Sequence, residues 1–398
     1  MRVSQGLLAG VSIALCLHGE AAAHSYKFVV LQRFGGHDGL QPGASLTTDS
    51  AANIYGTTEG GGAHGVGAVF RIDSRGNEKI LFSFGAGTVV FGQPRSNVIR
   101  DTLGNLYGTA LPLIGGGNEG GVYEISASGE ETVLHAFTGG SDGGYSLSNL
   151  TMDSAGNLYG TASEGGAFEG DCAEFGCGVV FEITPSGQYN VLYAFQGTDG
   201  EEPSAGVILD GSGNLYGTTA LGGAAGYGTV FKLDPSGDET VLYSFKGSSD
   251  GNMPVSELVM DQSGNLYGTT EYGGDNESSC NGLGCGVVFK IDAGANETVL
   301  HTFAGSTSDG SNPVSGLVMD ANATLYGTTQ YGGPNGSVGT VYALDTSGAK
   351  YKMVQSFPGF TDGSEPIAAL WLDASGDLLG TTQFGGGVDQ GVAFELKR

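Results

Sequence analysis

Six aspartates that each precede a glycine recur along the chain and could bind a cation or a sugar. A proline usually follows three residues after the glycine. Carboxylate oxygens are ligands that Ca²⁺ prefers, and carboxylates also suit polyhydroxylated ligands. The alternative is a turn, in which Asp bonds its own backbone and Gly takes a positive φ. The pattern leaves both open for Asp38, Asp142, Asp199, Asp250, Asp309 and Asp362.

A second set of seven aspartates precedes the tightest turn of each repeat. Asx-type turns explain this position well, and the adjacent ligands of a D-x-D-x-D-G calcium loop are absent. We therefore predict a structural role for this set. Its members are Asp49, Asp101, Asp153, Asp210, Asp261, Asp320 and Asp373.

Four cysteines beyond the N-terminal segment form two C-x4-C pairs, Cys172/Cys177 and Cys280/Cys285, and each pair precedes Gly-Val-Val-Phe. An even number at matching positions of an exported chain predicts local disulfides. A zinc site is the alternative, but no histidine lies near either pair in the sequence. No other set of residues has metal-ligand spacing.

Recognisable catalytic motifs are absent from the sequence: it has no G-x-S-x-G elbow, no H-E-x-x-H and no phosphate-binding loop. Paired carboxylates for glycoside hydrolysis are recognised in space rather than in sequence. Two functions therefore stay open. The first is a non-enzymatic binding or scaffold module, and the alternative is a carbohydrate-active enzyme, a glycosidase or lyase, with carboxylates on a loop face. His135 and His301 replace the tyrosines found at Tyr193 and Tyr243, so we predict packing roles for them.

The elements that position these residues come from an internal repeat. The segment Asn-Leu-Tyr-Gly-Thr-Thr recurs seven times, identical or slightly varied, at spacings of 51 to 59 residues. This period matches one blade of a β-propeller. In the fourth repeat, short runs rich in β-branched and aromatic residues alternate with turns, which predicts four strands per unit. Those strands cover residues 205–210, 214–219, 228–234 and 239–245.

The strand endings predict how the ring closes. Every fourth strand ends in Phe with Gly one or two residues later, but this ending occurs in only six of the seven repeats. The seventh repeat stops at its third strand, 391–397, while the N-terminal segment 28–34 carries the same Phe-Gly ending. We therefore predict a seven-bladed propeller of four antiparallel strands per blade, whose last blade is completed by the N-terminal strand. The loops between second and third strands share one face with the blade-to-blade connections, and this variable face is the predicted binding face.

The sequence resembles the Gloeo/Verruco (GloVer) tandem-repeat family of exported bacterial proteins. The resemblance rests on the pattern D-x-x-G-N-L-Y-G-T-T, a Gly-Gly loop, G-T-V-F-K-L and T-V-L-Y-S-F, which residues 261–270 and 228–245 carry almost unaltered. Local departures are Ile54, Ala323-Thr324 and Leu379. The family resemblance implies export and a propeller-like fold, but no particular activity.

Charge and the N-terminal segment limit the partners and the compartment. With 15 Lys and Arg against 42 Asp and Glu, the net charge of −27 argues against nucleic-acid binding. Arg2, the apolar run 6–17 and Ala21-Ala22-Ala23 predict a signal peptide over residues 1–23. The run is too short to span a membrane. We thus expect residues 24–398 to form one secreted, monomeric propeller that does not insert into a membrane. Its expected partner is a polysaccharide or an extracellular protein. We expect no cofactor, unless the Asp-Gly residues bind Ca²⁺.

Overall fold

The computed structural model describes residues 26–85, 91–113, 119–168, 172–274, 280–336 and 338–398. The predicted signal peptide, residues 1–23, lies outside this part of the chain. No helix among the described residues is long and apolar enough to cross a membrane.

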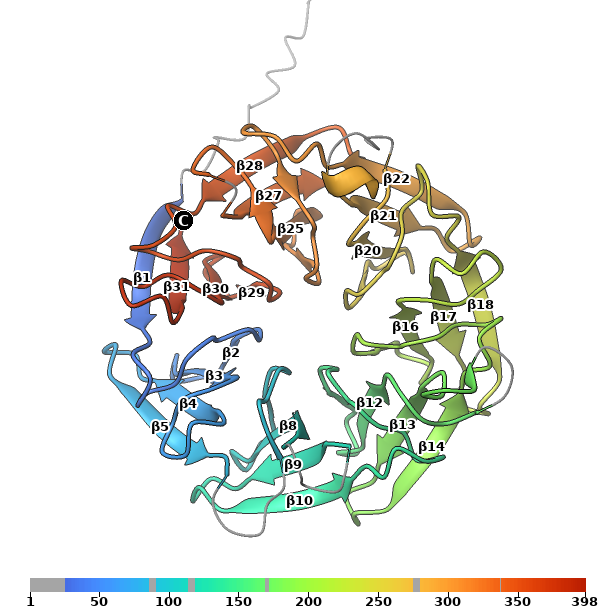
Figure 1. The fold of residues 1–398 in the computed structure, drawn as a ribbon, viewed down its shortest axis with the longest axis horizontal. Coiled ribbons are helices and arrows are strands. Elements are labelled where there is room, and N and C mark those ends of the chain that lie inside the picture. The colour runs from blue at the N-terminus through green and yellow to red at the C-terminus, as the bar shows by residue number, and fades with distance from the viewer. Residues whose placement is uncertain (1–25, 86–90, 114–118, 169–171, 275–279, 337) are drawn as a thin grey trace, which may run out of the picture.

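Seven four-stranded antiparallel sheets surround a central axis, so the prediction of an all-β, seven-bladed propeller is confirmed (Figure 1). Within each blade the strands follow one another from the axis outward.

The bounds of the strands, blade by blade, are as follows. Blade 1 holds β2 (Thr47–Thr48), β3 (Ile54–Thr58), β4 (Ala68–Ile72) and β5 (Glu78–Ser83), and blade 2 holds β7 (Ile99–Arg100), β8 (Leu106–Pro112), β9 (Gly121–Ile125) and β10 (Glu131–Ala136). Blade 3 holds β11 (Thr151–Met152), β12 (Leu158–Ala162), β13 (Val179–Ile183) and β14 (Tyr189–Ala194), and blade 4 holds β15 (Ile208–Leu209), β16 (Leu215–Thr219), β17 (Thr229–Leu233) and β18 (Glu239–Ser244). Blade 5 holds β19 (Val259–Met260), β20 (Leu266–Thr270), β21 (Val287–Ile291) and β22 (Glu297–Thr302), and blade 6 holds β24 (Val318–Met319), β25 (Thr324–Thr329), β27 (Thr340–Asp345) and β28 (Tyr351–Ser356). Blade 7 holds β29 (Trp371–Leu372), β30 (Leu378–Thr382), β31 (Val392–Lys397) and β1 (Lys27–Arg33); smaller elements are β6 (Phe91–Gly92), β23 (Gly310–Ser311), β26 (Tyr331–Gly332) and the 3₁₀ turn η2 (Cys280–Gly282).

The N-terminal strand closes the ring as the sequence predicts. β1 pairs antiparallel with β31, from Lys27 opposite Lys397 to Arg33 opposite Val392. The Phe28 ring stacks on Phe394 with 5.6 Å between centroids. The last blade is therefore assembled from both ends of the propeller.

The innermost strands are shorter than predicted. In blade 4 the expected strand 205–210 pairs with β16 only through Ile208 and Leu209. The preceding residues bond the neighbouring blade instead, since the Ala205 carbonyl accepts a hydrogen bond of 2.8 Å from Thr161 Oγ1 in blade 3. The other three strands of this blade lie within the predicted ranges.

The repeated glycine is required by packing against the third strand. A Cβ at Gly268 would lie 2.6 Å from Phe289 Cζ, and one at Gly217 would lie 2.7 Å from Phe231 Cζ. Tyr123 takes the place of this Phe in blade 2, over Gly108. The glycine thus lets an aromatic ring lie flat across the second strand of each blade.

The second aspartate set forms the turns that the sequence predicts. Asp261 Oδ1 accepts the backbone N–H groups of Ser263 and Asn265 at 2.8 and 2.9 Å. Its Oδ2 accepts Asn265 Nδ2 at 2.7 Å and the Tyr267 hydroxyl at 3.0 Å. One carboxylate therefore organises the whole D-x-x-G-N-L-Y turn.

The first threonine of each motif joins its blade to the next. Thr269 Oγ1 donates to the Ser315 carbonyl at 3.1 Å, and Thr381 Oγ1 donates across the closure to the Ala44 carbonyl at 3.0 Å. Both threonine side chains are buried. Equivalent bonds are made by Thr57, Thr109, Thr161, Thr218 and Thr328.

Replacing Thr269 with valine is expected to lower the free energy of unfolding by about 1–2 kcal/mol, because the buried Ser315 carbonyl loses its donor. Equilibrium denaturation measures this change. Thr269→Ser keeps the hydroxyl and serves as the control, with a smaller loss. A Thr269→Val chain as stable as the wild type would show that the bond contributes nothing.

Candidate functional site

The six Asp-Gly carboxylates lie in the connections that follow the outermost strands, away from the axis. Five of them accept a backbone N–H from the turn between strand and aspartate; for example, Gln196 N donates to Asp199 at 2.8 Å. Each also bonds a side chain of an outer strand or of its connection. These contacts are Gln32–Asp38, His135–Asp142, Tyr193–Asp199, Tyr243–Asp250, His301–Asp309 and Arg33–Asp362.

The bonding of this set favours the turn interpretation over a ring of ligands. The residues Asp250 and Asp309 are each only 8% exposed. Within the described ranges, no group of three or more His, Cys, Asp and Glu side chains is placed to hold a metal ion. Calcium binding by these aspartates stays a prediction.

Both cysteine pairs form disulfides, as predicted. Their Cα atoms lie 4.9 Å apart in Cys172–Cys177 and 5.3 Å apart in Cys280–Cys285. Each bridge lies in the loop between second and third strands, and the Cys285 carbonyl accepts Asn312 N at 2.9 Å. The bridges therefore fix loops that support the connection to the next blade.

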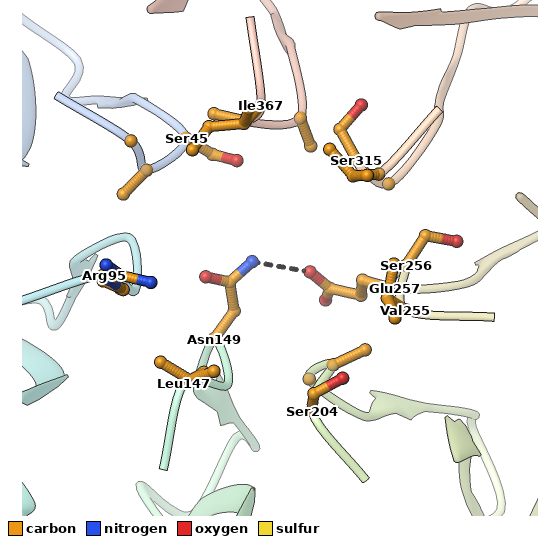
Figure 2. Close-up of a pocket in the computed structure, with 18 residues that line it drawn as sticks. Ser45, Arg95, Leu147, Asn149, Ser204, Val255, Ser256, Glu257, Ser315 and Ile367 are labelled. Atoms are coloured by element: carbon orange, nitrogen blue, oxygen red, sulfur yellow. Dashed lines mark hydrogen bonds between the residues drawn. The ribbon is translucent and has the colours of Figure 1, made fainter. Parts of the chain in front are cut away.

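A channel along the axis collects side chains from all seven blades (Figure 2). In each blade, the segment just before the innermost strand contributes two residues, two positions apart, to the lining of this channel. The first position holds Gly43, Arg95, Leu147, Ser204, Val255, Val314 and Ile367, and the second holds Ser45, Asn97, Asn149, Gly206, Glu257, Gly316 and Ala369. Most of these are small or apolar, so the few long polar side chains decide the channel's chemistry.

A polar bar crosses the channel at the second position. Asn149 of blade 3 donates from Nδ2 to Glu257 Oε2 of blade 5 at 2.9 Å (Figure 2). Asn149 Oδ1 in turn accepts the backbone N–H of Asn97 at 3.0 Å. Protein surrounds Glu257, although part of its surface is open to the channel. Burial raises the pKa of Glu257, and the bond from Asn149 opposes that rise.

An ion pair lies at the mouth of the channel on the loop face. Arg95 of blade 2 contacts Glu59 of blade 1 at 3.0 Å, and Glu59 is 8% exposed. Gln383 of blade 7 also reaches Glu59, with 3.4 Å between Nε2 and Oε1. Burial raises the pKa of Glu59, while the Arg95 guanidinium opposes the rise. Side chains of three blades thus meet at one side of the mouth.

Beyond the polar bar the channel opens into a chamber of about 380 Å³. Asn97, Asn149 and Glu257 line it together with Trp371 of β29. Among the described residues, Asn97 Oδ1 and Trp371 Nε1 are buried atoms without a hydrogen-bond partner. The lining of the chamber therefore combines a carboxyl group, two amide side chains and an aromatic residue.

Family membership follows from the repeats that build this ring. The Gloeobacter/Verrucomicrobia repeat model matches residues 20–173 and 169–394. The chain belongs to the Gloeobacter/Verrucomicrobia repeat family. In this family member the motif residues build turns, glycine contacts and blade junctions, whereas the polar channel residues lie outside the motif.

Solved structures share the fold at low sequence identity. Virginiamycin B lyase from Staphylococcus aureus superposes with a TM-score of 0.58 at 12% identity, over 94% of this chain and 100% of that chain. The extracellular domain of a putative one-component system from B. thetaiotaomicron gives a TM-score of 0.55 at 15% identity, over 93% of this chain and 41% of that chain. No curated protein matches the sequence. At these identities the similarity shows the fold alone.

The sequence interpretation missed the channel residues, although a signal for them exists. Six repeats share a Pro at one position, where the third repeat has Ser146, and aligning the repeats there puts Glu257 in a column that otherwise holds Ser, Asn, Gly and Ala. The same alignment puts Arg95 in a column of uncharged residues. Such a departure stands out only after the structure shows that both columns face the axis.

Proposed function

We propose that the chain is a non-enzymatic binding module that works outside the cytoplasm and holds a neutral polyhydroxylated ligand in its channel. The end of a sugar chain is the ligand class that suits this site. The observation that carries the proposal is the chamber, whose lining combines Trp371, Asn97, Asn149 and Glu257. Amide and carboxyl groups are hydrogen-bond partners for the hydroxyl groups of a sugar.

The chemistry of the lining favours hydroxyl groups over anions. Among the described residues that line the chamber, Glu257 is the sole acidic side chain and none is basic. A hydroxyl group can donate to the Glu257 carboxyl group and can accept a hydrogen bond from an amide N–H. The indole ring adds an apolar surface that a sugar face can cover.

Function outside the cytoplasm agrees with the two disulfides, which persist in oxidising compartments. The predicted signal peptide points the same way. An extracellular protein partner is the other ligand class, and the variable loop face would bind it.

The alternative function is a secreted carbohydrate-active enzyme, a glycosidase or lyase; as a glycosidase it would need a pair of carboxyl groups about 5–9.5 Å apart across the substrate. The Asp-Gly carboxylates make turn contacts at the rim, and Glu257 is the one carboxyl group among the described residues that line the chamber. We therefore favour binding over hydrolysis. Release of reducing ends from a polysaccharide, lost in Glu257→Gln, would support the enzyme instead.

Trp371 is the only tryptophan of the chain, so its fluorescence reports on the chamber. Titration with neutral oligosaccharides is expected to give a saturable change in emission. Asn149→Ala should weaken binding about tenfold, because the polar bar loses its central amide. Calorimetry provides the second measurement.

Asp362→Asn at the rim is the matched control and should bind like the wild type, since Asp362 contacts Arg33 and not the channel. If no neutral sugar changes the emission, or if Asn149→Ala binds with unchanged affinity, the chamber is not the binding site.

A further inference from the structure

Three cationic side chains line one cavity of about 240 Å³ at the junction of blades 1 and 2. Arg71 lies on β4, Lys79 on β5, and Arg100 on β7 of the next blade. Tyr55 forms the wall between them, and the Arg100 guanidinium carbon lies 5.9 Å from its ring centroid. In a chain with net charge −27, such a gathering of positive charge calls for an explanation.

The strand register places two like charges side by side. Arg71 pairs directly with Lys79 across β4 and β5. Like charges at directly opposed positions destabilise a sheet. The equivalent cross-strand pairs of the other blades avoid this: they are Glu124–Thr132, Glu182–Asn190, Lys232–Thr240, Lys290–Thr298, Ala343–Lys352 and Glu395–Val29.

Arg100 adds a third charge at a position that is uncharged elsewhere. The equivalent residues of the other inner strands are Thr48, Met152, Leu209, Met260, Met319 and Leu372. Methionine therefore fills this position in three blades without loss of the fold. The arginine of blade 2 is not needed for the architecture.

Within the described ranges, no ion pair neutralises these three side chains. Among the described residues, none of them takes part in an ion pair, and Arg71 Nε is a buried donor without a partner. The nearby carboxylates of Asp49 and Asp101 are occupied by their own turns. Of the other Lys and Arg side chains among the described residues, four form ion pairs (Arg33, Arg95, Lys397 and Arg398) and seven do not.

The facing turn of blade 2 lacks the carboxylate that most blades have there. Ser126 lines the cavity at the position that Asp73, Asp234, Asp292 and Asp345 occupy in blades 1, 4, 5 and 6. Its hydroxyl still closes the turn, because it accepts Glu130 N at 3.0 Å. Ser128 lies beside it, with 2.8 Å between the two hydroxyl oxygens. Hydroxyl groups thus face the cations where an internal ion pair would otherwise form.

We propose that the Arg71–Lys79–Arg100 cavity is a binding site for an oxyanion, a carboxylate, sulfate or phosphate group of a ligand. The two guanidinium groups present planar hydrogen-bond donors suited to such groups, and Lys79 adds a point charge. The site is separate from the channel and independent of the neutral ligand proposed for it.

The test compares the intact chain with the double variant Arg100→Met, Lys79→Thr, which carries the residues of other blades at both positions. Calorimetry and thermal melting at low ionic strength would use sodium glucuronate, sodium sulfate and inorganic phosphate as probes. At least one probe is expected to bind the wild type and raise its melting temperature. The double variant should bind it about tenfold or more weakly. The ranking of the three probes identifies which oxyanion source fits.

Lys352→Thr, at the position of Lys79 in blade 6, is the matched control and should bind the anion like the wild type. Sodium chloride at equal ionic strength separates binding from general screening. The proposal is overturned if no probe binds at millimolar concentration, or if the double variant binds with unchanged affinity. The proposal is supported if the probe no longer raises the melting temperature of the double variant, while this variant without probe melts like the wild type at low salt.

Discussion

Deleting residues 24–34, which include β1, is expected to abolish cooperative folding of the entire ring. β31 would lose its antiparallel partner and become a bare edge. The core of blade 7 would also lose Phe28, whose ring contacts Phe357 and Phe394 at 5.9 and 5.6 Å. Phe34 is fully buried against Phe70 of blade 1, and losing such a side chain alone costs about 3–5 kcal/mol. Since whole domains are stable by only about 5–15 kcal/mol, the combined loss removes the folded state.

A circular permutant separates loss of the strand from loss of the terminus. Lys27 pairs with Lys397, so the start of β1 lies beside the end of β31. A short linker can therefore join Arg398 to Tyr26 while a new terminus opens after Phe34. This chain should melt cooperatively, and the deleted chain should give a broad transition by circular dichroism. A deleted chain with the wild-type melting temperature would refute closure by β1.

The ring and its closure were predictable because their signals are local. A Phe-Gly ending is visible in sequence, and counting six such endings against seven repeats assigned segment 28–34 to the last blade. The turn set was predictable for the same reason, since Asp261 bonds residues only two to six positions away. Short-range hydrogen bonding leaves a fixed spacing in the sequence.

The channel and the inner strands depend on contacts between blades, which leave no such spacing. Asn149 and Glu257 are 108 residues apart in the sequence, and no local sequence pattern predicts the hydrogen bond between them. The segment before β15 was assigned to its own sheet because its apolar pattern resembles a strand. It instead accepts a hydrogen bond from Thr161 of the preceding blade.

At the rim, the sequence predicted the role of two histidines but not the residues that they contact. His135 and His301 have the predicted packing roles, as they stack on Tyr189 and Tyr351 at 3.7 and 3.9 Å. Those tyrosines begin the outer strands of the next blades. Where Tyr193 stands at the equivalent position, the next outer strand begins with Glu239 instead. The sequence varies in pairs across the blade junctions.

In four blades the outer strand begins with a glutamate, and these glutamates predict an unusual dependence of stability on pH. Glu78, Glu131, Glu239 and Glu297 begin outer strands, and each has a buried Oε1 without a partner. Burial raises the pKa of each of these carboxyls to about 7. Nearby carboxylates add to the rise at three of them: Asp38 at Glu78, Asp199 at Glu239 and Asp250 at Glu297.

Because folding raises these pKa values above the unfolded value of 4.5, the folded state binds more protons than the unfolded state. Their contribution to stability is fully present below pH 4.5 and is lost as the pH rises through about 7. The turn aspartates act in the opposite direction. Burial alone would raise the pKa of Asp261, but hydrogen bonds from Asn265, Tyr267 and Ser263 hold it below its usual value. The contribution of such turn aspartates to stability is present above the unfolded pKa of 3.8. It is lost as the pH falls through the lower pKa of the folded state.

The propeller is therefore expected to be most stable in mildly acidic solution, near the unfolded pKa values of its carboxyls, and to lose stability between that region and about pH 7. The variant with all four glutamates replaced by glutamine should melt several degrees higher than the wild type at pH 8. It should show little difference at pH 4, where the wild-type glutamates are protonated. Melting temperatures from pH 3 to 9 test this, with Glu130→Gln in an exposed turn as the control. A variant that melts at the wild-type temperature at pH 8 would show that these carboxyls are not the cause.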